Sequence, residues 1–179
     1  MPLFLITALP GTGKSTVCNE LHARGFEAYD GDYDHLAKWY NNSTGKPVAD
    51  HHERTPEFLQ THSRNIPRHL IEDLAAQAAD KPIFLCADPE NEDELQDLFA
   101  QTFALVADEK TRLYRLATRT NNVWGRLSHE RARDAANKPV AEERRRKYGY
   151  TIVDADVPVE QAVDQIVKAI KSEVASTDQ

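Results

Sequence analysis

The sequence predicts an α/β fold in which a parallel β-sheet is covered by helices on both faces. Short apolar runs alternate along the chain with segments whose apolar residues recur at helical spacing, an order typical of parallel sheets. The first apolar run leads into a loop with two glycines and then into a helical segment. A chain of 179 residues can bury roughly 70% of the surface of its unfolded form, so we expect one domain with its own core.

Five short apolar runs predict the strands, at residues 3–7, 26–29, 83–88, 103–108 and 150–154. Apolar residues at helical spacing predict helices over residues 14–24, 69–79, 92–101, 111–119, 126–147 and 159–174. Residues 34–68 are polar and aromatic, so we expect a helical insert without strands there. The polar tail, residues 172–179, is expected to fray.

Composition limits the partners that the protein can bind. Lys and Arg total 22 against 29 Asp and Glu, which gives a formal net charge of −7. This balance argues against a broad non-specific nucleic-acid surface, although a local basic site can still bind a small anion. We therefore expect a small-molecule acceptor, no nucleic-acid partner, and a monomer or small homo-oligomer.

Neither a secretory leader nor a membrane span is expected. The chain has no basic leader segment, and its longest apolar run is far shorter than the roughly 18 residues that cross a membrane. Cys18 and Cys86 lie in apolar segments without CxxC spacing, which predicts two buried free thiols. We expect a cytoplasmic protein without a membrane partner.

The most specific signal is the stretch ALPGTGKS at residues 8–15. In a strand, loop and helix of this kind, successive backbone N–H groups form a concave anion site at the positive end of the helix. Gly11 and Gly13 allow the bends, Lys14 reaches the β and γ phosphates, and Ser15 offers its hydroxyl to Mg²⁺. We expect a catalytic Lys14 and a nucleotide site along Pro10, Gly11, Thr12, Gly13, Lys14, Ser15 and Thr16.

This loop departs from the usual pattern at Ala8, where glycine is expected. Glycine matters there only if the backbone needs a positive φ or a very close approach. Ala8 directly follows a strand, where an extended conformation suits alanine. We therefore expect a working phosphate loop.

Acidic residues end two of the predicted strands. Asp30 and Asp32 stand two apart on an extended chain, so both carboxylates can face the same side. A carboxylate beside an acceptor hydroxyl can take its proton, whereas a phosphate acceptor needs no such base, so the pair favours a hydroxyl acceptor. Asp88, at the end of the third predicted strand, is expected to orient Mg²⁺ through water.

Three segments together resemble the shikimate kinase and nucleoside monophosphate kinase branch of the P-loop kinases. They are ALPGTGKST at residues 8–16, the acidic DGD at 30–32 and the arginine-rich RLYRLATRTNN at 112–122. The resemblance implies a three-layer α/β/α fold with a five-stranded parallel sheet, ATP and Mg²⁺ as cofactors, an acceptor lobe after the second strand and a mobile lid with arginines. We place the acceptor insert at residues 34–68 and the lid at 119–135 of a single domain, 1–179.

The resemblance also implies roles for individual residues. Asp32 binds or deprotonates the acceptor hydroxyl, Arg115 covers the adenine, and Arg119 contacts the phosphates during transfer. Arg115 and Arg119 stand four apart on a predicted helix and so share one face, where guanidinium forks suit phosphate oxygens. The expected metal ligands are Ser15, Asp30 and Asp88, and the loop beside the adenine is Asp156, Val157 and Pro158.

The insert and the lid supply the expected acceptor pocket. Its predicted residues are Asp30, Asp32, Trp39, Arg64 and Arg126, with Tyr40 and His62 nearby. The histidines of this region match no zinc spacing, so we expect no metal site from His51, His52, His62 and His69.

Each of these clusters also has a purely structural interpretation. The aspartates at 30–34 can form a solvated turn, residues 87–91 a helix-capping loop, and the arginines a charged helix surface. The insert can equally be a locally packed lobe.

The leading hypothesis is an ATP-dependent small-molecule kinase that transfers the γ-phosphoryl of MgATP to a hydroxyl-bearing metabolite or nucleoside. A nucleoside monophosphate kinase is the alternative within the same class. An ATP-binding or hydrolysing switch or assembly factor on the same fold is the alternative from another class. Phosphorylation of a polynucleotide 5′-hydroxyl is less favoured because the charge balance offers no long strand-binding surface.

Overall fold

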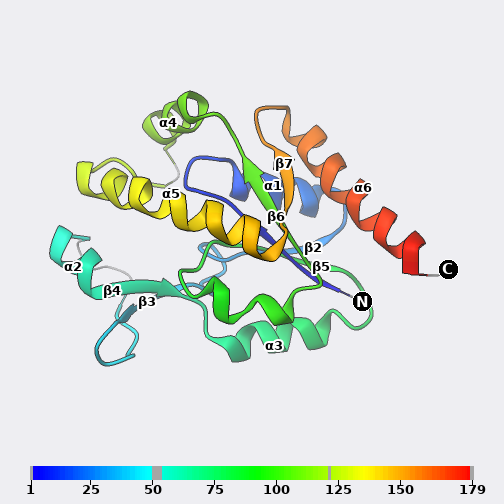
Figure 1. Cartoon of the computed structure of the whole chain (residues 1–179), viewed down its shortest axis with the longest axis horizontal. Coiled ribbons are helices and arrows are strands. Elements are labelled where there is room, and N and C mark those ends of the chain that lie inside the picture. Colours follow the sequence, from blue (N-terminus) through cyan, green and yellow to red (C-terminus); the bar gives the residue numbers. More distant parts are fainter. Residues whose placement is uncertain (1, 50–53, 121, 178–179) are drawn as a thin grey trace.

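A computed structural model describes residues 2–49, 54–120 and 122–177, and its centre is a five-stranded parallel sheet (Figure 1). The strands are β1 (Leu3–Thr7), β2 (Glu27–Asp30), β5 (Ile83–Cys86), β6 (Gln101–Val106) and β7 (Thr151–Asp154). They lie in the order β2-β5-β1-β6-β7, and every neighbouring pair is parallel. The predicted fold class is confirmed.

The central strands are buried on both faces, which explains their continuous apolar runs. Every residue of β1 and β5 is buried. The register pairs Phe4 with Phe84, and their rings stack with centroids 5.2 Å apart. Such a strand pair places the loops that follow β1 and β5 next to each other at the carboxyl edge of the sheet.

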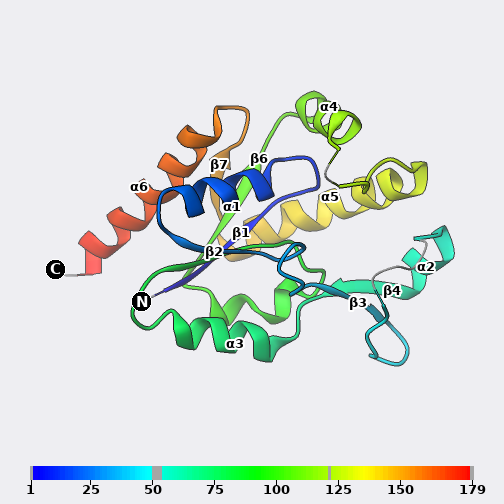
Figure 2. The same cartoon turned by 180° about the vertical axis from the view of Figure 1, so that it is seen from behind.

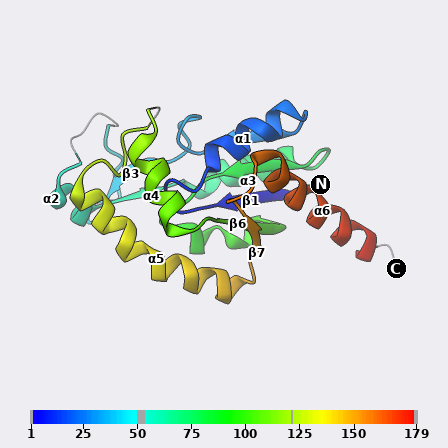
Figure 3. The same cartoon turned by 90° about the horizontal axis from the view of Figure 1, so that it is seen from above.

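Helices cover both faces of the sheet (Figures 2 and 3). Helices α1 (Lys14–Ala23) and α6 (Val159–Thr177) pack on one face, where the core includes Val17, Leu21, Val163 and Ile166. Helix α3 (Arg68–Gln77) packs on the other, with a core that includes Leu5, Ile71, Leu74 and Leu95. Cys18 and Cys86 are buried free thiols in the first core, as predicted. Within the described residues, no helix is both long and apolar enough to cross a membrane.

Two segments after β5 differ from the sequence prediction. The helix expected at 92–101 is replaced by two short 3₁₀ turns, η1 (Glu92–Glu94) and η2 (Gln96–Leu98). The end of this segment cannot be helical because it pairs with β1 in the sheet. The Ala100 amide donates to the carbonyl of Leu3 at 2.9 Å, and β6 begins at Gln101. Helix α6 also continues to Thr177, three residues past the end of the predicted helix.

The expectation that the insert lacks strands is also wrong. Strands β3 (Lys38–Asn41) and β4 (His62–Asn65) form an antiparallel hairpin, and a short helix, α2 (Pro56–Thr61), precedes β4. β4 reads HSRN and contains no apolar residue, so an apolar pattern could not reveal it. The hairpin and α2 project from the end of the molecule opposite the two termini (Figure 1).

Candidate functional site

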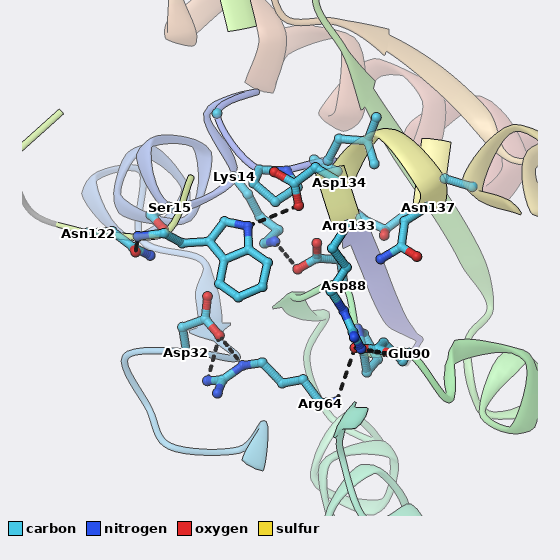
Figure 4. Close-up of a pocket in the computed structure, with 18 of the residues that line it drawn as sticks. Lys14, Ser15, Asp32, Arg64, Asp88, Glu90, Asn122, Arg133, Asp134 and Asn137 are labelled. Carbon is cyan, nitrogen blue, oxygen red and sulfur yellow. Dashed lines mark hydrogen bonds and ion pairs between the residues drawn. The ribbon is translucent and has the colours of Figure 1, made fainter. Parts of the chain in front are cut away.

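A cavity of about 690 Å³ opens at the carboxyl edge of the sheet. It lies between the loop after β1, the insert, helix α4 (Glu109–Thr118) and helix α5 (Ser128–Tyr148). Figure 4 shows side chains from the start of α1, the insert and α5 pointing toward this space. Of the predicted site, its lining includes Pro10, Gly11, Gly13, Lys14, Ser15, Thr16, Asp32, Trp39, Arg64, Asp88, Arg115 and Arg119.

The loop after β1 has the backbone geometry of an anion cradle. Gly11 and Gly13 have φ values of +86° and +111°, and the Thr12 amide donates to the Leu9 carbonyl at 3.2 Å. A Cβ at Gly11 would lie 2.7 Å from the carbonyl oxygen of Arg112 in α4, so glycine is required there by packing as well as by φ.

Ala8 needs no strained backbone. Among the described residues, His35 is the one non-glycine residue with a positive φ, so Ala8 adopts a conformation that any side chain allows. Its methyl group is buried, with 3% of the residue exposed. The departure from glycine at this position therefore leaves the cradle intact.

Lys14 and Asp88 form an ion pair in the middle of the cavity (Figure 4). Burial disfavours the ammonium charge, yet Asp88 and Asp32 outweigh this effect and raise the pKa of Lys14. Burial also raises the pKa of Asp88, and this effect outweighs the opposite effect of the Lys14 charge. The Asp88 side chain still has 36% of its surface exposed, on the side of the cavity. The site therefore holds a charged lysine beside a carboxylate.

The two aspartates at the end of β2 do not face the same side. Asp32 lines the cavity, and Arg64 of β4 donates to its carboxylate through Nη2 at 2.8 Å. Asp30 is buried and turns back on its own loop, where Oδ1 accepts from the amides of Asp32 and Tyr33 at 3.0 and 3.2 Å. The extended geometry assumed from the sequence ends at Asp30, because residues 31–34 form a turn.

The charge of Asp32 is favoured by its neighbours. Burial opposes ionisation of this carboxyl, but the charges of Lys14 and Arg64 outweigh burial and lower its pKa. Arg64 also lies 5.9 Å from the ring centre of Trp39, which anchors the guanidinium to the insert. The structure thus brings Asp32, Arg64 and Trp39 together.

The two arginines of the predicted lid entry are held by backbone carbonyls. Arg115 donates to Thr12 in the phosphate loop at 3.0 Å and to Ala155 after β7 at 3.0 and 3.1 Å. Arg119 donates to the Trp124 carbonyl at 2.6 Å, and burial lowers its pKa. Both line the cavity, but Arg115 lies beside the phosphate loop, whereas Arg119 follows the last residue of α4 and lies beside Trp124.

Several predicted residues lie outside the cavity. Arg126 is exposed and donates to the Arg119 carbonyl at 3.3 Å, and Asp156 accepts from the Asp108 amide at 2.7 Å. Neither lines the cavity, and the same holds for Asp30, Thr12, Val157 and Pro158. Val157 and Pro158 follow Ala155, whose carbonyl Arg115 contacts, so this loop lies on the α4 side of the cradle.

A hard cation has two oxygen donors available in the cavity. The Ser15 hydroxyl and the Asp88 carboxylate both line it, and Mg²⁺ commonly takes one or two protein oxygens together with substrate phosphates. Asp30 is not placed with them. Within the described residues, no group of three or more His, Cys, Asp or Glu could hold a metal. His62 stacks on Phe58, His69 lies in α3, and His51 and His52 lie outside the described residues.

Helix α5 and the loop after β5 bring further residues to the cavity, which the sequence did not predict. Arg133 of α5 pairs with Glu90 at 2.6 Å, and Asp134 accepts from the Trp124 indole N–H at 2.9 Å. Asp134 is 4% exposed, and burial raises its pKa to about 6. In the sequence, Arg133 and Asp134 are two charged residues of a helix in which most residues are polar or charged, so nothing distinguishes them from the exposed ones.

The fold and the cradle define a P-loop domain. The model of the AAA domain family AAA_18 matches residues 5–136, and the chain belongs to this family. No curated protein matches the chain.

Solved structures of kinases share the whole fold. A gluconokinase from Sinorhizobium meliloti 1021 is 18% identical, with a TM-score of 0.58 over 98% of this chain and 97% of that one. A sugar kinase from Janibacter sp. HTCC2649 is 17% identical, with a TM-score of 0.55 over 96% and 95%. Deoxyadenosine kinase from M. mycoides is 13% identical, with a TM-score of 0.53 over 94% and 99%. At these identities the likeness concerns the fold.

Proposed function

We propose that the protein is an ATP-dependent kinase that transfers the γ-phosphoryl group of MgATP to a hydroxyl group of a small molecule. The observation that carries this proposal is the position of Asp32, which faces the same cavity as Lys14 and is held by Arg64. A carboxylate at the acceptor side of a phosphate cradle has a use when the nucleophile must lose a proton.

The donor side of the site fits a nucleoside triphosphate. Backbone N–H groups of the cradle and the ammonium of Lys14 bind the phosphate oxygens, and Arg119 offsets the charge that develops on the transferred group. Arg115 joins the cradle to the loop after β7, and a nucleotide base lying over this loop would be next to its guanidinium. Ser15 and Asp88 would hold Mg²⁺, which supplies charge neutralisation and orientation of the β and γ phosphates.

The acceptor side fits a hydroxyl nucleophile. Asp32 accepts the proton as the acceptor oxygen forms its bond to the γ-phosphorus and the bond to the bridging oxygen of ADP breaks. Arg64 holds the Asp32 carboxylate in place, and the buried ring of Trp39 packs against Arg64. The gluconokinase, sugar kinase and deoxyadenosine kinase that share the fold are named for molecules that carry hydroxyl groups, which supports the same class of acceptor.

A coupled ADP-release assay over a panel of sugars, sugar acids, cyclitols, nucleosides and nucleoside monophosphates tests the proposal. We expect turnover with a hydroxyl acceptor and none with Lys14→Ala. Turnover with nucleoside monophosphates alone would assign a nucleoside monophosphate kinase. If protein that binds MgATP turned over no acceptor but hydrolysed ATP slowly, and a protein partner stimulated hydrolysis, the chain would be an ATP-dependent switch.

A further inference from the structure

The acceptor insert and the segment after α4 meet directly across the mouth of the cavity. The rings of Trp39 in β3 and Trp124 lie 6.2 Å apart, and the guanidinium of Arg54 lies 5.4 Å from the Trp124 ring centre. Two parts of the chain that both line the cavity therefore share one aromatic contact.

A buried carboxylate of α5 strengthens this contact. Glu130, with 1% of its side chain exposed, accepts from Arg54 Nε at 2.9 Å. It also accepts from the backbone amides of Gly125 and Leu127, at 2.8 and 3.3 Å. In addition, Nε2 of His129 donates to the Arg54 carbonyl at 2.6 Å. One carboxylate thus fixes the insert and the loop before α5 to the same point.

Arg133 makes the second connection, one turn further along α5. Its Nη2 donates to both carboxylate oxygens of Glu90, at 2.6 and 2.8 Å, and to the His62 carbonyl at 3.1 Å. Its Nη1 donates to the Leu59 carbonyl, and its guanidinium lies 5.7 Å from the ring centre of Trp39. Arg133 therefore contacts α2, β3, β4 and the loop after β5 at once.

These contacts continue to the phosphate end of the site. Arg119, at the end of α4, donates to the Trp124 carbonyl, and Arg115 in the same helix donates to Thr12 of the cradle. A continuous series of polar and aromatic contacts thus runs from the cradle through α4 and Trp124 to Trp39 and the insert. Such a series carries coupling only if it includes an element with two arrangements, between which both ends shift the equilibrium.

We propose that Arg133 is a positioning residue that holds the acceptor insert against α5, so that ordering of the nucleotide side of the cavity also orders the acceptor side. The proposal rests on the proposed function only in assigning the nucleotide to the cradle. Because coupling between sites is reciprocal, a nucleotide that favours the joined arrangement raises the affinity for the acceptor, and the acceptor raises the affinity for the nucleotide by the same factor.

Hydrogen exchange with MgADP as the probe tests the coupling without an identified acceptor. In the wild-type protein, MgADP should slow amide exchange in residues 8–16 and also in residues 56–65, which belong to the insert. In Arg133→Met, slowing should persist in residues 8–16 and be lost in residues 56–65. Lys138→Met is the matched control, because Lys138 of α5 pairs with Glu109 of α4 and not with the insert, and it should keep both effects.

The outcomes separate the two proposals. If MgADP slows exchange in residues 8–16 of the wild type but leaves residues 56–65 unchanged, the coupling is absent and the kinase proposal stands. Equal slowing in both segments of Arg133→Met would show that Arg133 does not position the insert. No slowing in residues 8–16 of the wild type would contradict nucleotide binding itself. Should Arg133→Met melt before the assay, Arg133→Lys, which keeps the charge but loses the fork, should show reduced slowing in residues 56–65.

Discussion

The ammonium of Lys14 donates to the carboxylate of Asp88 and so joins the first residue of α1 to the end of β5. We expect Lys14→Ala to abolish turnover, because it removes the cation that binds the β and γ phosphates and leaves Asp88 facing them without a partner. A fluorescent nucleotide titration and a steady-state assay measure the loss, and a melting curve checks the fold. Wild-type kcat in this variant would contradict the assignment of the cradle.

Asp88→Asn tests the metal side of the same pair. The variant keeps an oxygen near Ser15 but loses the charge that attracts Mg²⁺. Even a carboxylate that reaches a metal only through another ligand typically costs about 10- to 100-fold in metal affinity or activity when it is lost. We therefore expect the Mg²⁺ concentration for half-maximal turnover to rise on that scale, while nucleotide binding without Mg²⁺ changes little. An unchanged Mg²⁺ dependence would remove Asp88 from the metal site.

Asp32→Asn and Asp30→Asn form a contrasting pair of variants. Asp32 faces the cavity and is expected to take the acceptor proton, so its loss should lower kcat roughly 10²-fold or more. Asp30→Asn keeps an oxygen that can accept from the Asp32 and Tyr33 amides, so a much smaller loss is expected. Equal and small effects of both variants would favour a phosphate acceptor.

The lowered pKa of Asp32 predicts how kcat/KM depends on pH. Because Lys14 and Arg64 lower that pKa against the effect of burial, the carboxylate is ionised throughout the neutral range. Protonation of Asp32 should therefore reduce kcat/KM only at a pH below the pKa range of ordinary aspartates, where the pH falls through the lowered pKa of Asp32. Arg64→Met should move this acid limb to higher pH, which a pH profile of kcat/KM can measure.

Gly11→Ala and Ala8→Gly test the two unusual positions of the loop. At Gly11 a methyl group would meet the Arg112 carbonyl at 2.7 Å with φ at +86°, and a left-handed backbone alone costs a non-glycine residue about 1–2 kcal/mol. We expect Gly11→Ala to lower the melting temperature and weaken nucleotide binding. Ala8→Gly should leave nucleotide binding unchanged, since Ala8 has no positive φ.

Asp134 should make stability depend on pH. Burial raises its folded pKa from 3.8 to about 6, so the folded chain binds this proton more tightly than the unfolded chain does. Its contribution is therefore present below pH 3.8 and lost as the pH rises toward 6, by about 3 kcal/mol at most. Denaturant unfolding of wild type and Asp134→Asn should differ by an amount that changes between pH 4 and 6.5 and is constant above. A constant difference over the whole range would contradict the raised pKa.

The sheet and the cradle could be predicted because each depends on local sequence. Buried parallel strands leave continuous apolar runs, and GTGKS fixes a loop whose backbone makes the site. The hairpin of the insert could not be predicted in this way. β4 is polar on both faces, and its partner in the ladder lies more than twenty residues away, with Trp39 opposite Arg64.

The acceptor side of the site was predicted in part. Asp32, Trp39 and Arg64 were named from an acidic pair and an aromatic segment, and the structure brings all three to the cavity. Asp30 was misplaced because a turn that its own carboxylate caps begins at that residue. Arg133 and Asp134 could not be distinguished from the other charges of α5, because only tertiary structure decides which of them face inward.

Helix α5 differs from the other long helices in what its buried side contains. Its buried side chains among the described residues are two carboxylates, Glu130 and Asp134, whereas α6 buries Ala162, Val163 and Ile166. Pulling α6 from the sheet would expose apolar surface at about 25 cal/mol per Å², while water can replace the hydrogen bonds of α5 as it leaves. The wall of the cavity formed by α5 is therefore held by hydrogen bonds and ion pairs more than by apolar burial, so substitutions on its inner side should reshape the cavity while leaving the packing of the sheet intact.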